Sequence, residues 1–158
     1  MLSMIFIIVL PILVFDQLTK IVVTKSLSLY QSIPVIQGIF HITLVHNRGA
    51  AFGILKNQVP LFIITSLLAI GLIYYHLKGS AYKKLTLSDV SLSFILAGAT
   101  GNLIDRIFLG YVVDFLDFRV WPVFNIADSA ITVGAVLIGY SILFKKTTTP
   151  GGSLKDKV

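Results

Sequence analysis

The sequence contains no cysteine and no glutamate, and it contains few charged residues of any kind. Only 13% of its 158 residues are charged, whereas an ordinary soluble domain carries about 25%. The absence of cysteine excludes disulfide bonds, thiolate metal sites and a thiol nucleophile. Without glutamate no H-E-x-x-H motif is possible, and the three histidines are widely separated. We therefore expect no metal site and no cofactor.

Hydrophobic residues make up 56% of the chain, which excludes a disordered protein and indicates an integral membrane protein. The net charge of +6 would suit nucleic-acid binding only if the basic residues clustered on one face. Instead Lys and Arg are scattered or lie beside apolar runs, which membrane topology explains better. We expect contact with membrane lipids and no nucleic-acid partner.

Four apolar stretches of about 20 residues are each long enough to cross the hydrocarbon core of a bilayer. They are Leu2–Thr24, Val59–Leu77, Val90–Leu109 and Asn125–Phe144. The sequence thus predicts an all-α integral membrane protein with four transmembrane helices, forming one domain over residues 1–146. Residues 147–158 are polar and rich in turn-forming residues, so we expect them to be a disordered cytoplasmic tail.

The lysines predict the orientation of the four spans. Lysines 78, 83 and 84 lie between the second and third spans, and lysines 145, 146, 155 and 157 follow the fourth. Because cytoplasmic loops carry the excess of basic residues, both termini are predicted to be cytoplasmic. The long segment 26–57 between the first two spans then lies on the outer side.

This outer segment carries a strand pattern. In Phe40–His46 every second residue from Phe40 to Leu44 is large and apolar, and this period of two is typical of a β-strand. A turn signal at Asn47-Arg48-Gly49 follows, and Ala51–Leu55 could supply a second strand. We expect a small extracytoplasmic β-sheet between the first two helices, lying on the outer surface of the membrane.

Polar residues gather at the outer ends of the predicted spans and in the adjoining loops. They are Asp16, Lys20, Asn47, Asn102, Asp105, Arg106, Asp114, Asn125 and Asp128. An ionised side chain at the centre of a membrane helix costs about 2.5–3.5 kcal/mol on insertion scales, so these charges require pairing, protonation or water. The sequence predicts a polar site at the outer face.

Several of these acids also have purely structural interpretations. Asp16 and Lys20 have the i, i+4 spacing of a helical ion pair. Asp128 could simply cap the fourth helix, since Asp is favoured at a helix start. Asp117 is predicted to be a solvated loop acid. Asp114, in contrast, stands among apolar neighbours, and desolvation there would raise its pKa.

Asp105 and Arg106 leave two interpretations open, a contact between helices or a part in substrate binding. They could also form a proton relay, which would make the chain a small proton-coupled transporter or channel subunit. A transporter would distribute titratable groups through the membrane depth, but the inner halves of the last three spans lack them. The transporter therefore remains the weaker alternative.

A pair of carboxyl groups suits this composition better than a serine nucleophile. Two neighbouring Asp side chains have different pKa values, so that one can act as an acid while the other acts as a base. Asp114 and Asp128 are the best pair, because one precedes the fourth helix and the other begins it. Such a pair can direct water onto an amide carbonyl.

Five motifs resemble one known family, lipoprotein signal peptidase, also called signal peptidase II, over about residues 5–145. They are D-Q-L-T-K at 16–20, H-N-R-G-A-A-F-G at 46–53, G-N-L-I-D-R at 101–106, V-V-D-F at 112–115 and F-N-I-A-D-S at 124–129. Their number and order make the resemblance specific.

The resemblance implies a bacterial inner-membrane aspartyl endopeptidase with four spans. Such an enzyme removes the signal peptide from diacylglyceryl-modified prolipoproteins, cutting just before the lipidated Cys. By this resemblance, Asp114 and Asp128 would be the catalytic dyad. The substrate-binding residues would be Asn47, Asn102, Arg106 and Asn125, and the supporting residues would be Asp16, Lys20 and Asp105. The outer sheet would match the family's periplasmic cradle. The segment 116–123, which would correspond to the family's lid over the site, is short compared with that lid. We also expect a monomer.

Overall fold

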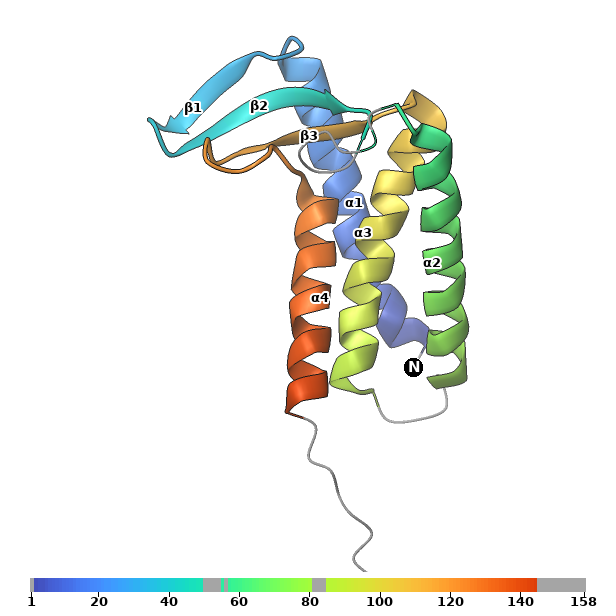
Figure 1. Cartoon of the computed structure of the whole chain (residues 1–158). Coiled ribbons are helices and arrows are strands. Elements are labelled where there is room, and N and C mark those ends of the chain that lie inside the picture. Colours follow the sequence, from blue (N-terminus) through green and yellow to red (C-terminus); the bar gives the residue numbers. More distant parts are fainter. Residues whose placement is uncertain (1, 50–54, 56, 81–84, 145–158) are drawn as a thin grey trace, which may run out of the picture.

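The computed structural model describes residues 2–49, 55, 57–80 and 85–144. Its helices are α1 (Leu2–Ser26), α2 (Val59–Ser80), α3 (Leu87–Leu109) and α4 (Ile126–Leu143), and its strands are β1 (Ser32–Ile36), β2 (Phe40–Asn47) and β3 (Val112–Asp117). All four helices are long and apolar enough to cross a membrane, which confirms the four predicted spans. The helices run side by side, and the sheet lies across one end of them (Figure 1).

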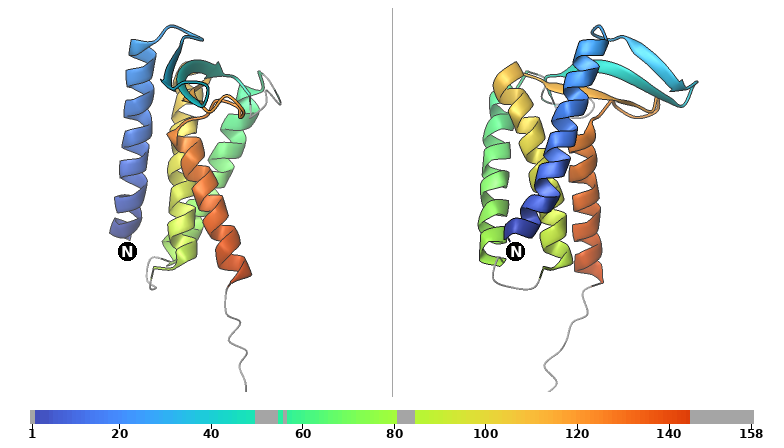
Figure 2. Two further views of the ribbon diagram at one scale, coloured as in Figure 1. Left: turned by 90° about the vertical axis from the view of Figure 1, so that its left-hand side faces the viewer. Right: turned by 180° about the vertical axis from the view of Figure 1, so that it is seen from behind.

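α3 is the central helix of the bundle. It packs against α1, α2 and α4, and its contact with α4 is the most extensive. A side chain at Gly134 of α4 would lie 2.6 Å from the backbone oxygen of Ser91 in α3, so glycine permits this close approach. Seen from behind, α1 crosses the other face of the bundle (Figure 2).

Both ends of α3 carry specific capping residues. The Thr86 hydroxyl accepts a hydrogen bond from the backbone of Asp89, while the Asp89 carboxylate accepts one from the backbone of Thr86. This capping box places the helix start before Val90, where hydropathy alone predicted it. At the other end Gly110, with φ of 77°, adopts the left-handed conformation that stops the helix before β3.

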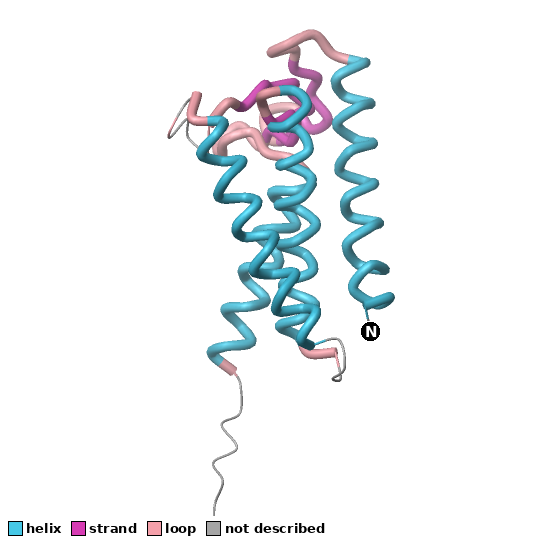
Figure 3. Tube along the Cα trace, turned by 90° about the vertical axis from the view of Figure 1, so that its right-hand side faces the viewer, coloured by secondary structure: helices cyan, strands magenta, loops and turns pink. Residues whose placement is uncertain are grey.

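The sheet has the order β1-β2-β3, and both pairs are antiparallel. The predicted sheet between the first two helices is therefore present, but a strand from the connection between α3 and α4 completes it. Figure 3 shows the three strands gathered at one end of the helices. The strand predicted over Ala51–Leu55 falls almost wholly outside the described residues, as does the tail 147–158, so the domain boundary at 146 stays a prediction.

One face of the sheet is anchored to the end of α1. Val23 of α1 and Leu27, which directly follows the helix, form a buried cluster with Leu44 of β2 and with Val113 and Phe115 of β3. Because successive side chains of a strand point to opposite faces, the residue between Val113 and Phe115 points away from this cluster. That residue is Asp114, so the same packing that holds the sheet aims this carboxyl group.

Candidate active site

Asp114 and Asp128 line the same cavity, which has a volume of about 790 Å³. The cavity lies between β3, the segment that follows it, α3 and α4. Its polar side chains include Asn47, Asn102, Arg106, Ser129 and Thr132, and its apolar side chains are Val112, Phe118, Trp121, Pro122, Val123, Phe124, Ile131 and Val133. The fold thus brings the two acids, which are separated along the chain, to one cavity with largely apolar walls.

Asp114 is almost completely buried, and both of its carboxyl oxygens accept hydrogen bonds. The amide of Asn125 donates to Oδ1 at 2.7 Å, and the amide of Asn47 donates to Oδ2 at 2.9 Å. Burial raises the pKa of Asp114 to about 7, and the neighbouring charge of Asp128 adds to this rise. The two hydrogen bonds and the charge of Lys20 oppose it. Asp114 therefore exchanges a proton near neutral pH.

Asp128 lies in the first turn of α4, but it is not the cap of the helix. Asn125 is the N-cap residue, and its side-chain oxygen accepts a hydrogen bond of 2.8 Å from the backbone of Asp128. The carboxyl Oδ1 of Asp128 accepts a hydrogen bond of 2.8 Å from the amide of Asn102. No described residue donates a hydrogen bond to its second oxygen, Oδ2. This oxygen is available to a molecule in the cavity.

The three asparagines of the site hold the two acids. Asn47 and Asn125 bind Asp114, whereas Asn102 binds Asp128. Asn125 also donates to the side-chain oxygen of Asn102 at 3.1 Å, and its side chain is fully buried outside the cavity lining. Asn47 and Asn102 therefore line the cavity together with the two acids, whereas Asn125 does not line it.

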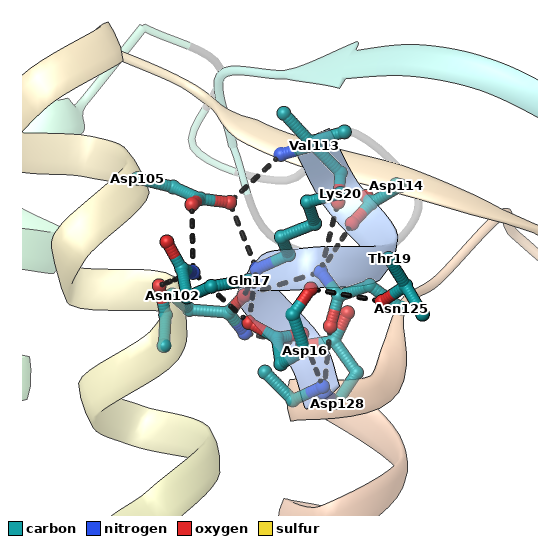
Figure 4. A network of polar contacts seen from close by, with 12 residues as sticks. Asp16, Gln17, Thr19, Lys20, Asn102, Asp105, Val113, Asp114, Asn125 and Asp128 are labelled. Carbon is teal, nitrogen blue, oxygen red and sulfur yellow. Dashed lines mark hydrogen bonds and ion pairs between the residues drawn. The ribbon is translucent and has the colours of Figure 1, made fainter. Parts of the chain in front are cut away.

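A buried ion cluster lies directly behind this site (Figure 4). The Nζ atom of Lys20 lies 2.9 Å from Oδ2 of Asp16, 2.8 Å from Oδ2 of Asp105 and 3.1 Å from Oδ1 of Asn102. The ion pair predicted between Asp16 and Lys20 is therefore present, and Asp105 joins it. Through Asn102 the cluster is connected to Asp128.

Each acid of this cluster also accepts a hydrogen bond from the backbone immediately before Asp114 or Asp128. Oδ1 of Asp16 accepts a hydrogen bond of 2.8 Å from the backbone N–H of Ala127, which precedes Asp128. Oδ2 of Asp105 accepts one of 3.1 Å from the backbone N–H of Val113, which precedes Asp114. Two acids from two different helices thus fix the chain at both members of the pair.

Gln17 belongs to the same cluster. Because its side chain is uncharged, the pattern of charged residues in the sequence did not identify it. Its amide nitrogen lies 3.1 Å from Oδ2 of Asp16, 3.2 Å from Oδ1 of Asp105 and 3.2 Å from the backbone oxygen of Gly101. In the sequence it stands out only as a member of the D-Q-L-T-K motif. Its position next to Asp16 and three residues before Lys20 was the feature that could have identified it.

The prediction that Asp117 is a solvated loop acid is wrong. Asp117 ends β3 and is only 5% exposed, because its side chain lies against Thr43 of β2. The Thr43 hydroxyl donates to it at 2.7 Å, and the guanidinium of Arg119 lies at 3.0 Å. Burial alone would raise the pKa of Asp117, but these hydrogen bonds outweigh burial and lower it. Asp117 stabilises the sheet and does not line the cavity.

Gly101 is required where α1 meets α3. A Cβ atom at Gly101 would lie 2.6 Å from Oδ2 of Asp16, so Gly101→Ala is expected to displace that carboxylate and lower the free energy of unfolding by about 1–3 kcal/mol. The matched control is Gly139→Ala in α4, where a Cβ meets nothing within 4 Å. Thermal unfolding in detergent measures both. Equal stability of the two variants would contradict the prediction.

Comparisons with known proteins identify the family. The family model for signal peptidase (SPase) II matches residues 8–144. A lipoprotein signal peptidase of Caldanaerobacter subterraneus subsp. tengcongensis is 52% identical over 82% of this chain and 89% of its own length. That of Halothermothrix orenii is 47% identical over 85% of this chain and 92% of its own.

Solved structures agree with these relatives. A bacterial membrane enzyme determined by the in meso method at 2.3 Å resolution superposes with a TM-score of 0.82 and 32% identity, covering 99% of this chain and 94% of its own. A second such enzyme, at 1.9 Å resolution, gives a TM-score of 0.79 with 34% identity over 90% of this chain and 94% of its own. This chain belongs to the signal peptidase II family.

Proposed function

We propose that the protein is a membrane aspartyl endopeptidase that removes the signal peptide from diacylglyceryl-modified prolipoproteins, cutting just before the lipidated Cys. Family membership supports a peptidase that acts on prolipoproteins, and it does not support the transporter alternative. The observation that carries the aspartyl mechanism is the pair Asp114 and Asp128, which line one cavity in different environments.

The two environments suggest the resting protonation of the pair. Asp114 has a pKa of about 7, so it carries a proton over much of the acidic and neutral range. Asp128 keeps one oxygen free of hydrogen bonds from the described residues, and that oxygen can accept a proton from water. We assign Asp128 as the general base and Asp114 as the general acid.

In the first step Asp128 takes a proton from a water molecule while the water oxygen attacks the scissile carbonyl carbon. Asp114 donates its proton to the carbonyl oxygen, which gives a neutral tetrahedral diol and leaves Asp128 protonated. In the second step the C–N bond breaks, and the departing nitrogen takes the proton from Asp128. Asp114 recovers its proton from a hydroxyl group of the diol as the new carboxyl group forms, so the pair returns to its starting state.

The cavity also suits a substrate that carries lipid. Its lining includes the two acids, and Phe118, Ile131 and Val133 contribute apolar walls that can receive acyl chains. The ends of the described chain lie at the other end of the bundle from the sheet (Figure 1). With the lysines marking the cytoplasmic side, this arrangement supports cytoplasmic termini and an active site near the outer face of a bacterial inner membrane.

The test uses the purified protein in detergent micelles and one prolipoprotein prepared with and without the diacylglyceryl group on its Cys. We expect release of the signal peptide from the modified precursor alone, with the lipidated Cys as the new N-terminus by mass spectrometry. Cleavage of both precursors at equal rates would refute the lipid requirement. Failure to cleave the modified precursor would refute the proposed function.

The pH profile provides a separate prediction. Because Asp114 must be protonated to act as the acid, kcat is expected to fall as pH rises through about 7. The hydrogen bond from Asn47 lowers the pKa of Asp114, so Asn47→Ala should raise that pKa further and move the alkaline limb to higher pH. Thr43→Val, which removes a hydrogen bond to Asp117 instead, is the control and should leave the limb in place. A limb unmoved by Asn47→Ala would contradict the assignment.

A further inference from the structure

Arg106 lines the cavity, but among the described residues it has no ion-pair partner, unlike the buried cation Lys20. Lys20 is held by two carboxylates and an amide oxygen. No hydrogen bond or ion pair joins the guanidinium of Arg106 to any described residue, although Asp114 and Asp128 lie within its electrostatic reach. Among the described residues, Arg106 therefore makes no ion pair with a neighbouring helix.

One aromatic ring does contact this guanidinium. The central carbon of the Arg106 guanidinium lies 4.9 Å from the centroid of the Phe62 ring, which belongs to α2. This distance lies within the range of a cation–π interaction, which strengthens when the cation is partly removed from water. Arg106 is half-buried, so the contact is partly shielded. No described residue of α2 lines the cavity itself.

An arginine held in this way is suited to bind oxygen atoms in the cavity. The guanidinium has five N–H donors, and at membrane depth these donors require acceptors. The contact with Phe62 holds the guanidinium, and no described residue accepts a hydrogen bond from its N–H groups, which leaves them available to a ligand in the cavity. The carbonyl oxygens of a bound precursor are acceptors of this kind.

We propose that Phe62 is a positioning residue, which holds the guanidinium of Arg106 against carbonyl oxygens of the precursor. This inference rests on the proposed function, because the ligand is the prolipoprotein substrate. Phe62 acts from outside the cavity and through Arg106 alone. It therefore contributes to the binding of the precursor and not to the proton transfers of the dyad.

The test measures kcat and KM with a diacylglyceryl-modified prolipoprotein. Phe62→Leu keeps an apolar side chain but removes the ring, and we expect KM to rise about tenfold with kcat changed less than about twofold. Phe62→Trp retains an aromatic face and should keep KM at or below that of the unaltered protein. The control is Phe6→Leu in α1, where the same change at a site that is 58% exposed should alter neither constant.

A double-mutant cycle separates positioning through Arg106 from a general packing effect. In an Arg106→Gln background, Phe62→Leu should raise KM no further, because the cation is already gone. An unchanged KM in Phe62→Leu, an equal loss for Phe62→Trp, or a further rise in the Arg106→Gln background would overturn the inference. Unaltered protein that fails to cleave the precursor would instead refute the proposed function, so the two failures are distinguishable.

Discussion

Replacing Asp114 or Asp128 with Asn is expected to abolish release of the signal peptide while leaving the protein folded. Asn can neither give up nor accept a proton at neutral pH, so either change removes one half of the proposed acid–base pair. General acid–base catalysis by a positioned group contributes roughly 10²–10⁴-fold, and here both halves act in the same step. We therefore expect kcat to fall at least about 10³-fold in each variant. Release of the peptide from a lipid-modified prolipoprotein measures the effect.

The matched control is Asp117→Asn. Asp117 lies in the same strand as Asp114 and is also buried, but it binds Thr43 and Arg119 and does not line the cavity. This variant should retain kcat close to that of the unaltered protein. Near-normal cleavage by either dyad variant, with thermal unfolding confirming a folded protein, would rule out the aspartyl mechanism.

Hydropathy was sufficient to predict the helices of this protein, because a membrane span needs only sufficient length and predominantly apolar residues. The bounds of α3 show the limit of that signal. Its first turn is stabilised by a capping box formed by Thr86 and Asp89, and a polar residue in a capping role lowers local hydropathy at the point where the helix starts. The helix therefore begins before the apolar run does.

The strand β3 was missed for a different reason. Val112–Asp117 is short and mostly apolar, and it becomes a strand because it pairs with β2. This pairing joins segments far apart in the sequence, so periodicity along the chain does not reveal it. The same pairing places Asp117 beside Thr43, which explains why an acid expected in solvent is buried.

For the candidate site, too, the sequence predicted which charged residues lie there but not most of the contacts that they make. The acids and cations were identified because a charge in an apolar span is rare and costly. Their individual roles depend on contacts between α1, α3, β3 and α4, and no spacing rule within one helix predicts that Asp16 binds the backbone of Ala127. Asn125 illustrates this best, because its amide is buried behind both acids and is not exposed to the cavity.

Lys20→Met is expected to cause the largest loss of stability. Met is similar in length but carries no charge, so Asp16 and Asp105 would remain buried without the cation that now lies within 2.9 Å of both. Removing one partner from a buried ion pair costs about 3–5 kcal/mol, and here two carboxylates lose the same partner. Thermal unfolding in detergent measures the effect. Lys25→Met, on the exposed last turn of the same helix, is the control and should change stability little.

A triple variant tests whether the uncompensated charge is the cause. Adding Asp16→Asn and Asp105→Asn to Lys20→Met makes the cluster neutral, yet each Asn keeps an oxygen for the backbone N–H of Ala127 or Val113. We expect this variant to recover most of the lost stability. If it remained as unstable as Lys20→Met, the loss would come from packing and not from charge.

Activity then separates the buried cluster from the dyad. Asp16 and Asp105 hold the backbone before Asp128 and Asp114, so Lys20→Met should lower stability and kcat together. Substitution of Asp114 or Asp128 should lower kcat alone. A Lys20→Met variant that loses stability but keeps full kcat would show that the dyad holds its geometry without the cluster. Loss of both in parallel would mean that a salt bridge behind the site fixes the positions of the acid and the base.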